Sequence, residues 1–277
     1  MKKFLFIIST VLIFLSMSLL NSCERDTSLQ NKTFPIKIKE SVMYNEMFTF
    51  PVETELSIEG KSLNFVLPDG YKLITLLTDK DENERVKSFS KSSVSCECLA
   101  GKGCDPYMIG NQSGCSTDGT CSRCLMQIEK GAEKFYLKDA QIVNFNKPER
   151  FFTDEDDFQN IPSPKPFIFK DKDVLEHFYK FIEGHTNESD IEKLKGATIN
   201  KIPEGYVMVP TEFLGKLIVV GMKKQGILGF FLDDSKGYNC SCGSGSGCTY
   251  ESTWTPKGTI HYCSAEGCSK CTLQHEQ

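Results

Sequence analysis

Twelve cysteines occur in two sets of six with nearly the same spacing, and they are the residues of this chain best able to do chemistry. Both sets read C-x-C-x5-C, then a gap of 10 or 14 residues, and both close with C-x-x-C. Agreement of this extent indicates an internal repeat. We call residues 96–124 the first module and residues 240–271 the second module. Their cysteines are Cys96, Cys98, Cys104, Cys115, Cys121 and Cys124, and Cys240, Cys242, Cys248, Cys263, Cys268 and Cys271.

Cysteines in this arrangement can form disulfides, bind a metal as thiolates, or exchange disulfides with another protein. The modules contain few apolar residues, so disulfides or a bound metal must supply the free energy that orders them. A four-thiolate zinc or copper(I) site would leave two cysteines over in each module, which favours disulfides. The closing C-x-x-C motifs lack the strand-to-helix setting that lowers a thiol pKa in thiol oxidoreductases. Metal binding is therefore the first alternative and thiol–disulfide exchange the second.

The C-x-C pairs restrict which disulfides can form. Residues two apart in an extended strand lie roughly 6.5–7 Å apart and their side chains point the same way. We therefore expect Cys96 to bond a partner other than Cys98, and Cys240 a partner other than Cys242. This restriction leaves most of the possible pairings open.

Outside the cysteines, the sequence contains no pattern that indicates catalysis. It has no nucleophile elbow, phosphate-binding loop or zinc-protease helix. We interpret His177, His185 and His261 as ordinary surface or half-buried histidines rather than metal ligands. The acidic run at residues 153–157 lacks the spacing of a calcium-binding loop and is typical of a solvated linker. We expect a protein that is not an enzyme and has no cofactor, with copper or zinc on the module cysteines as the alternative.

The N-terminus predicts export and attachment to a membrane. Two lysines precede an apolar run at residues 4–20, as in a secretory signal. The run ends in Leu-Asn-Ser-Cys at residues 20–23, which resembles the lipobox of bacterial lipoproteins. The resemblance implies a signal peptide at residues 1–22, acylation (palmitate included) at Cys23, and a location at a bacterial membrane, the outer membrane or the cell surface. It also accounts for the thirteenth cysteine, because twelve then remain for the two modules.

Around the modules, the hydrophobic pattern predicts an α+β fold of two duplicated small β-rich domains, each with a C-terminal six-cysteine loop module. Period-two alternation predicts short strands from residue 33 to residue 77. Pro-Asp-Gly-Tyr at residues 68–71 and Pro-Glu-Gly-Tyr at residues 203–206 stand at equivalent places before the two modules. Helical spacing of apolar residues predicts one clear helix at residues 171–184, and a shorter one at Ser189–Leu194.

These patterns predict the order of domains along the chain. A polar tether at residues 23–32 leads into domain 1 at residues 33–130, which includes the first module. A stiff linker at residues 131–166, rich in proline at its end, connects it to domain 2 at residues 167–277.

Charge restricts the partners that we expect. The formal charge of −5 becomes −7 when cleavage of the predicted signal peptide removes Lys2 and Lys3. An acidic chain is poorly suited to neutralise nucleic-acid phosphates. We expect a membrane partner through Cys23 and no nucleic acid, while any protein or surface partner is unknown. For a ligand, the candidate places are the groove between the two copies and the unequal 10- and 14-residue segments that carry Tyr107 and Trp254.

Overall fold

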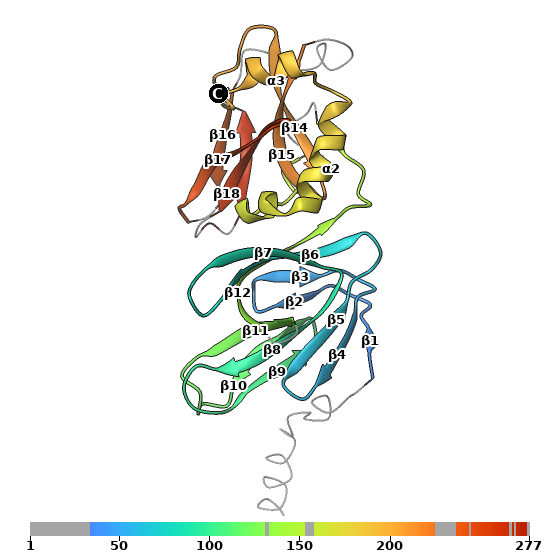
Figure 1. Cartoon of the computed structure of the whole chain (residues 1–277), viewed down its shortest axis with the longest axis vertical. Coiled ribbons are helices and arrows are strands. Elements are labelled where there is room, and N and C mark those ends of the chain that lie inside the picture. The colour runs from blue at the N-terminus through green and yellow to red at the C-terminus, as the bar shows by residue number, and fades with distance from the viewer. Residues whose placement is uncertain are drawn as a thin grey trace, which may run out of the picture.

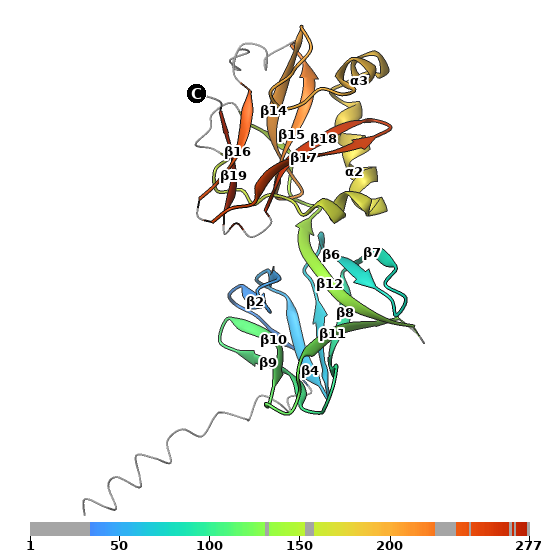
Figure 2. The same ribbon diagram turned by 90° about the vertical axis from the view of Figure 1, so that its left-hand side faces the viewer.

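The computed structural model describes residues 34–130, 133–152, 158–224, 237–243, 245–265, 268 and 270–275. Strands dominate this part of the chain, with two α-helices and one short 3-10 helix, which confirms the α+β fold class (Figures 1 and 2). The predicted signal peptide, the predicted lipidation site Cys23 and the acidic run at residues 153–157 lie outside the described residues. Among the described helices, none combines the length and the apolar character needed to cross a membrane.

The first half of the molecule, which we define as residues 34–144, is a pair of packed β-sheets. One sheet has the strand order β1-β4-β5-β8-β11-β12-β6-β7, and the other has the order β3-β2-β10-β9. Aromatic side chains of the smaller sheet, Tyr44, Phe48 and Phe50, pack with aliphatic side chains of the larger sheet in a common core. The strands are β1 (Ile36–Lys37), β2 (Val42–Tyr44), β3 (Phe48–Phe50), β4 (Glu55–Glu59), β5 (Ser62–Val66), β6 (Tyr71–Thr78), β7 (Glu84–Phe89), β8 (Lys91–Cys98), β9 (Cys104–Ile109), β10 (Gln112–Thr117), β11 (Cys124–Lys130) and β12 (Glu133–Asn144).

The second half, residues 145–275, is a five-stranded sheet covered on both faces. Its strand order is β13-β14-β15-β18-β17, and the pair β16-β19 forms a separate ribbon. Helices η2 and α2 pack on one face, while α3 and the β16–β19 ribbon pack on the other. The elements are β13 (Arg150–Phe151), η2 (Pro166–Lys170), α2 (Lys172–Glu183), α3 (Glu188–Leu194), β14 (Tyr206–Phe213), β15 (Lys216–Lys223), β16 (Tyr238–Cys242), β17 (Cys248–Thr255), β18 (Gly258–Ala265) and β19 (Cys271–His275).

Both predicted helices are confirmed, with clear reasons for where they begin. The side chain of Asp171 accepts hydrogen bonds from the backbone N–H groups of Asp173 and Val174, which caps α2, and Gly184 follows its last turn. Helix α3 begins with a capping box between Asn187 and Asp190.

The Pro-x-Gly-Tyr sequences form the same turn at the same place in each half. The N–H of Tyr71 donates to the carbonyl of Pro68 over 3.1 Å before β6, and the N–H of Tyr206 donates to the carbonyl of Pro203 over 3.2 Å before β14. The glycines of the two turns have φ angles of 81° and 82°, a region that L-residues rarely adopt. The repeat therefore begins at these turns and extends through the modules.

The linker expected at residues 131–166 needs correction, because much of it belongs to sheets. Strand β12 (residues 133–144) pairs with both β11 and β6 in the middle of the eight-stranded sheet, and β13 joins the second sheet. The acidic run at residues 153–157 and the prolines at residues 162–166 gave the segment the composition of a linker, and charged residues such as Lys134, Lys138 and Asp139 also occur along β12. In the sheet, Phe135, Leu137 and Ala140 are buried beside them, as expected of a strand with one covered face.

One hydrophobic core joins the two halves. Ile74 of β6 and Val143 of β12, which are 0% and 1% exposed, lie in the same cluster as Phe167 and Phe213 of the second half. An ion pair of 2.5 Å between Lys72 on β6 and Asp173 on α2 spans the same junction. The halves are therefore packed against each other, and the expected division into domains at residues 130 and 167 stays a prediction.

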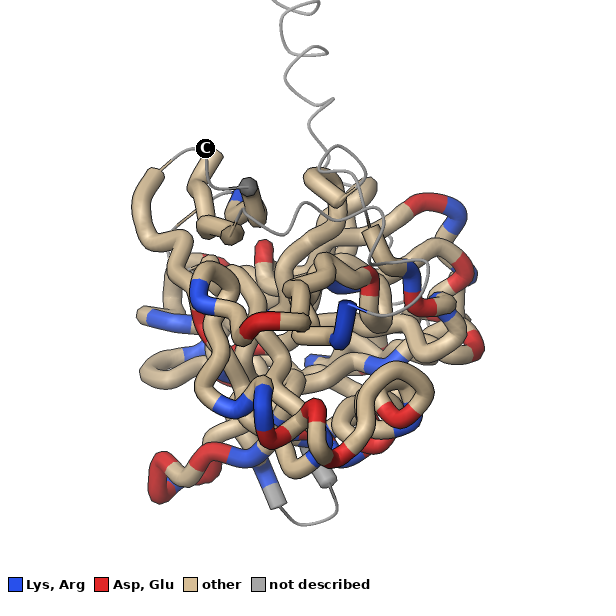
Figure 3. The backbone as a smooth tube through the Cα atoms, turned by 90° about the horizontal axis from the view of Figure 1, so that it is seen from above, with Lys and Arg blue, Asp and Glu red and all other residues tan. Residues whose placement is uncertain are grey.

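Acidic and basic residues are interspersed over the molecule. Seen from above, Lys and Arg positions alternate with Asp and Glu positions around the described backbone (Figure 3). In this view no side of the described chain is purely basic.

Candidate functional site

All twelve module cysteines form disulfides, and the connectivity is the same in both modules. Counted along each module, the first cysteine bonds the fourth, the second the fifth and the third the sixth. As predicted, neither C-x-C pair is bonded internally. The bonds are Cys96–Cys115, Cys98–Cys121 and Cys104–Cys124 in the first module, and Cys240–Cys263, Cys242–Cys268 and Cys248–Cys271 in the second.

The strands that carry the cysteines also pair in the same register. Cys98 lies opposite Cys124 across β8 and β11, as Cys242 lies opposite Cys271 across β16 and β19. The central hairpins agree likewise, since Cys104 pairs with Thr117 and Cys248 pairs with Ala265. Each module therefore consists of two antiparallel ribbons joined by two disulfides, while the third ties its first strand to the segment after the central hairpin. The cysteines thus lie on or beside strands rather than within one long loop.

The two modules differ in the length of the central hairpin. The β9–β10 hairpin ends with the pair Ile109 and Gln112, whereas the β17–β18 hairpin continues for two more residue pairs, to Thr255 and Gly258. This accounts for the 10- and 14-residue gaps. Trp254 lies in the added length, is 55% exposed and contacts only the ammonium group of Lys195, 5.6 Å from its ring, among the described ring and cation contacts.

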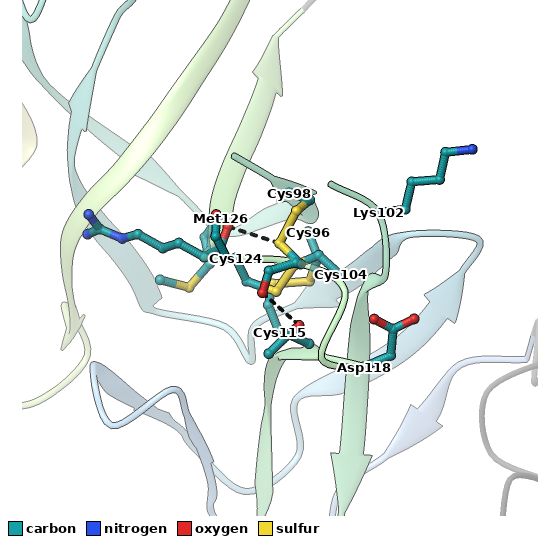
Figure 4. Close-up of a disulfide and its surroundings, with 12 residues drawn as sticks. Cys96, Cys98, Lys102, Cys104, Cys115, Asp118, Cys124 and Met126 are labelled. Carbon is teal, nitrogen blue, oxygen red and sulfur yellow. Dashed lines mark hydrogen bonds between the residues drawn. A yellow bond between two sulfur atoms is a disulfide. The ribbon is translucent and has the colours of Figure 1, made fainter. Parts of the chain in front are cut away.

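The interiors of the modules differ as well. In the first module the buried cluster consists of cysteines alone, and Figure 4 shows their sulfur atoms gathered at its centre. In the second module, Cys263 and Cys271 pack among Leu194, Tyr238 and Leu273 in a core that extends beyond the module. The first module therefore depends on its disulfides to a greater degree than the second.

Three sulfur atoms converge in each module at equivalent positions. The Sγ atoms of Cys96, Cys104 and Cys115 lie within 4.8 Å of one another, as do those of Cys240, Cys248 and Cys263. Two of the three in each group are bonded to each other, so the connectivity itself explains the proximity. A thiolate site for copper or zinc would require these bonds to be reduced first.

A cleft of about 410 Å³ lies between the two halves, beside the second module. Its volume falls in the range of small-molecule pockets. The sequence analysis named a groove between the two copies, whereas Asp139, Gln141 and residues 159–166 of this cleft belong to the segment that it assigned to the linker. One wall comes from β12 of the first half, a second from residues 159–166, and a third from the second module. The lining residues are Asp139 and Gln141, the segment 159–166, and Ser264, Ala265, Cys268, Lys270 and Cys271.

Residues 159–166, which we call the strap, are bonded to both halves. The side-chain carbonyl of Gln141 accepts from the N–H of Lys165 over 2.8 Å, and its amide donates to the carbonyl of Ser163 over 3.2 Å. On the other side, the hydroxyl of Ser163 donates to the carbonyl of Cys271 over 3.3 Å. The N–H of Leu217 also donates to the carbonyl of Pro162. The strap and the shared core together hold the walls of the cleft at a fixed separation.

Two lysines lie at the strap. The ammonium group of Lys165 donates to the carboxylate of Asp139 and to the carbonyls of Ala140 and Met47. Burial, together with the positive charge of Lys165, lowers the pKa of Lys216 to about 8. Among the described contacts, none is made by the side chains of Gln159, Asn160 or Lys270, so these groups remain available to a polar ligand in the cleft.

The histidines do not form a site. His177 contacts the carboxylate of Glu149 at 2.7 Å, and His185 contacts the carbonyl of Phe181 at 2.8 Å. His261 is 1% exposed, and its Nδ1 lies 2.7 Å from the hydroxyl of Tyr250. Each of the three imidazoles therefore has a partner among the described residues, and that of His261 is buried. Tyr107 lies elsewhere, in a recess of about 300 Å³ on the first half.

We expect His261 to make stability depend on pH. Burial lowers its pKa to about 4, whereas an unfolded histidine takes up a proton near pH 6.5. The stabilisation of the folded state by neutral His261 is therefore complete above pH 6.5 and is lost as the pH falls towards 4. At pH 5 the free energy of unfolding is lower by about 2 kcal/mol for this reason. Urea denaturation at pH 7 and pH 5 measures this, and His261→Gln should remove that part of the difference. His185→Gln serves as the control and should retain the full difference in unfolding free energy between pH 7 and pH 5. An equal difference in the two variants would show that His261 is not its source.

Comparison with known proteins yields no relative: no family model, no curated protein and no solved structure matches the chain. The candidate site therefore rests on geometry alone.

The sequence analysis named a groove between the two copies, but apart from Cys268 and Cys271 it singled out none of the residues that line this cleft. Gln141, Gln159 and Asn160 carry no motif, and they become neighbours only because the strap folds back between β12 and the second module. The proline-rich end of the strap was the one available signal, and it was interpreted as a linker.

Proposed function

We propose that this chain is an exported, lipid-anchored protein that binds a ligand in the cleft between its two halves and does not catalyse a reaction. The observation that carries the proposal is the cleft itself, whose walls come from β12, the strap and the second module. A binding site built from both halves explains why a small exported protein would keep two disulfide-bonded copies in a fixed arrangement.

The chemistry of the lining supports binding rather than catalysis. Its polar side chains are three amides, two hydroxyls, two lysines and the carboxylate of Asp139. Asp139 accepts from Lys165 and the hydroxyl of Ser163 donates to the carbonyl of Cys271, so among the described contacts no lining hydroxyl is hydrogen-bonded to that carboxylate. The lipobox resemblance at Cys23 supports attachment to the outer membrane or the cell surface. Thiol–disulfide exchange is a second candidate, because Cys268 of the Cys242–Cys268 disulfide lines the cleft.

Filling the cleft tests the proposal. Ala265 is an exposed residue on the cleft wall, and Ala265→Trp should occupy the space that a ligand needs. The probe is an array of immobilised oligosaccharides and short peptides, incubated with the soluble chain of residues 24–277. We expect the substitution to lower the signal of the bound probe at least about tenfold, the loss of roughly 1.4 kcal/mol of binding free energy.

Ser116→Trp provides the matched control, because it adds the same side chain to an exposed position of the first module. It should leave the signal unchanged, and mass spectrometry should recover the bound probe chemically intact. Loss of signal in both variants, the absence of any bound probe, or conversion of the probe would contradict the proposal.

A further inference from the structure

A second recess lies at the opposite end of the first half from the cleft. It has a volume of about 430 Å³ and lies between β1 and the tip of the β9–β10 hairpin. Figure 1 shows β1, β9 and β10 in the part of the first half that faces away from α2 and the second sheet. Ile38, Val42 and Met108 give the recess an apolar floor.

Large apolar side chains stand around this recess and are open to solvent. Phe34 is 79% exposed, Ile109 is 72% exposed and Ile36, which lines the recess, is 39% exposed. Isolated exposed apolar residues are ordinary, but several together beside an apolar recess are typical of an interaction surface. We call Phe34, Ile36 and Ile109 with the recess between them the apolar end.

The position of the apolar end along the chain indicates what it faces. Phe34 follows Cys23 by eleven residues, and only ten residues separate them. A chain of ten residues spans at most about 36 Å when fully extended. If Cys23 carries the lipid, the apolar end is thus confined to the neighbourhood of the bilayer surface.

The connecting segment itself is a poor candidate to cover this surface. Residues 24–33 are Glu-Arg-Asp-Thr-Ser-Leu-Gln-Asn-Lys-Thr, with Leu29 as the only large apolar residue. One leucine cannot fill a recess of this volume and shield three further side chains. The bilayer is the apolar phase within reach of all of them.

We propose that the apolar end is a membrane-contacting surface, in which Phe34, Ile36 and Ile109 insert into the interfacial region of the bilayer. The orientation that this requires rests on the proposed lipid anchor at Cys23. Insertion at this end adds a second, non-covalent contact to the lipid and restrains the first half against the membrane. The cleft, at the other end of the first half, then points away from the membrane and stays accessible to a ligand.

Vesicle binding by the chain without its lipid tests the surface directly. The soluble chain of residues 24–277 is sedimented with phosphatidylcholine vesicles, which carry no net charge and so isolate the apolar contribution. We expect measurable partition into the pellet, unaffected by salt, and a drop of at least about tenfold in the partition coefficient for Phe34→Ser combined with Ile109→Ser. A tenfold drop corresponds to a loss of roughly 1.4 kcal/mol of partition free energy, and we expect the removal of two exposed apolar side chains to cost at least this much.

Trp254→Ser is the stringent control, since Trp254 is also exposed but belongs to the second half. It should leave the partition unchanged. No vesicle binding by the unsubstituted chain, or a loss caused by Trp254→Ser instead, would overturn the proposal.

A separate measurement distinguishes failure of the surface from failure of the anchor. The full-length chain and its Cys23→Ser variant are expressed in a bacterial host and the membrane fraction is assayed in high salt. Retention that depends on Cys23, without vesicle binding by the soluble chain, would support the anchor and reject the apolar end. Vesicle binding by the soluble chain, together with a mass of the membrane-fraction protein that shows no acyl chains on Cys23, would support the surface and reject the anchor.

Discussion

Replacing Ile74 with aspartate is expected to destabilise the protein by about 3–5 kcal/mol, because it places an unpaired carboxylate in the core that joins the two halves. Ile74 is 0% exposed and belongs to the cluster that contains Phe167 and Phe213. The carboxylate must either lose its hydration or take up a proton, and both cost free energy. Urea denaturation measures the change in the free energy of unfolding, and limited proteolysis locates it.

Limited proteolysis should show whether Ile74→Asp loosens the junction between the two halves or leaves it intact. If the shared core fixes the halves, cleavage between residues 144 and 166 becomes rapid, because the strap loses its support. Val66→Asp is the matched control, since Val66 lies in the same eight-stranded sheet but is 45% exposed. It should cost about 1 kcal/mol or less and leave the cleavage pattern unchanged. An equally small effect of Ile74→Asp would show that the halves do not depend on a common core.

This core could not be predicted from the sequence, although its members lie in elements that could. Alternation predicted a strand over residues 72–77, but it left open what the outer face of that strand contacts. Ile74 points into the junction while Leu73 and Leu77 point into the core of the first half. Both faces of the strand are therefore apolar, and the sequence cannot say that one of them receives a second domain.

The cysteines show where local reasoning succeeds and where it stops. Geometry within two residues was enough to exclude bonds inside each C-x-C pair, and that prediction is confirmed. The full connectivity depends on the register between strands far apart in sequence, such as β8 with β11. Local spacing does not determine such a register.

The prediction of a linker at the residues of β12 was wrong for a related reason. Its sequence alternates, but with lysine and aspartate between the apolar residues, and a proline-rich segment soon follows. Composition favoured a linker, whereas pairing with β6 and β11 supplies the hydrogen bonds that stabilise it as a strand. The cleft depends on this strand, so the error about β12 also concealed Asp139 and Gln141 as site residues.

The two modules should respond differently to the loss of the same disulfide. Replacing Cys96 and Cys115 with alanine removes a crosslink between residues 19 apart in the sequence, and replacing Cys240 and Cys263 removes one between residues 23 apart. Loop-closure entropy alone predicts a similar cost of about 3 kcal/mol for each. The packing around them is not similar, because the first module has only cysteines in its buried cluster.

We therefore expect hydrogen exchange to distinguish the variants where denaturation does not. Without Cys96–Cys115, backbone amides of residues 99–123 should exchange within seconds, because Met108 is the only residue of this segment besides the cysteines that packs in a described hydrophobic core. Without Cys240–Cys263, the amides of β17 and β18 should remain protected, since Ile260 and Tyr262 still pack in the core shared with α2. Hydrogen–deuterium exchange with mass spectrometry measures both. Equal loss of protection would mean that crosslinking, and not the composition of the surrounding core, orders each module.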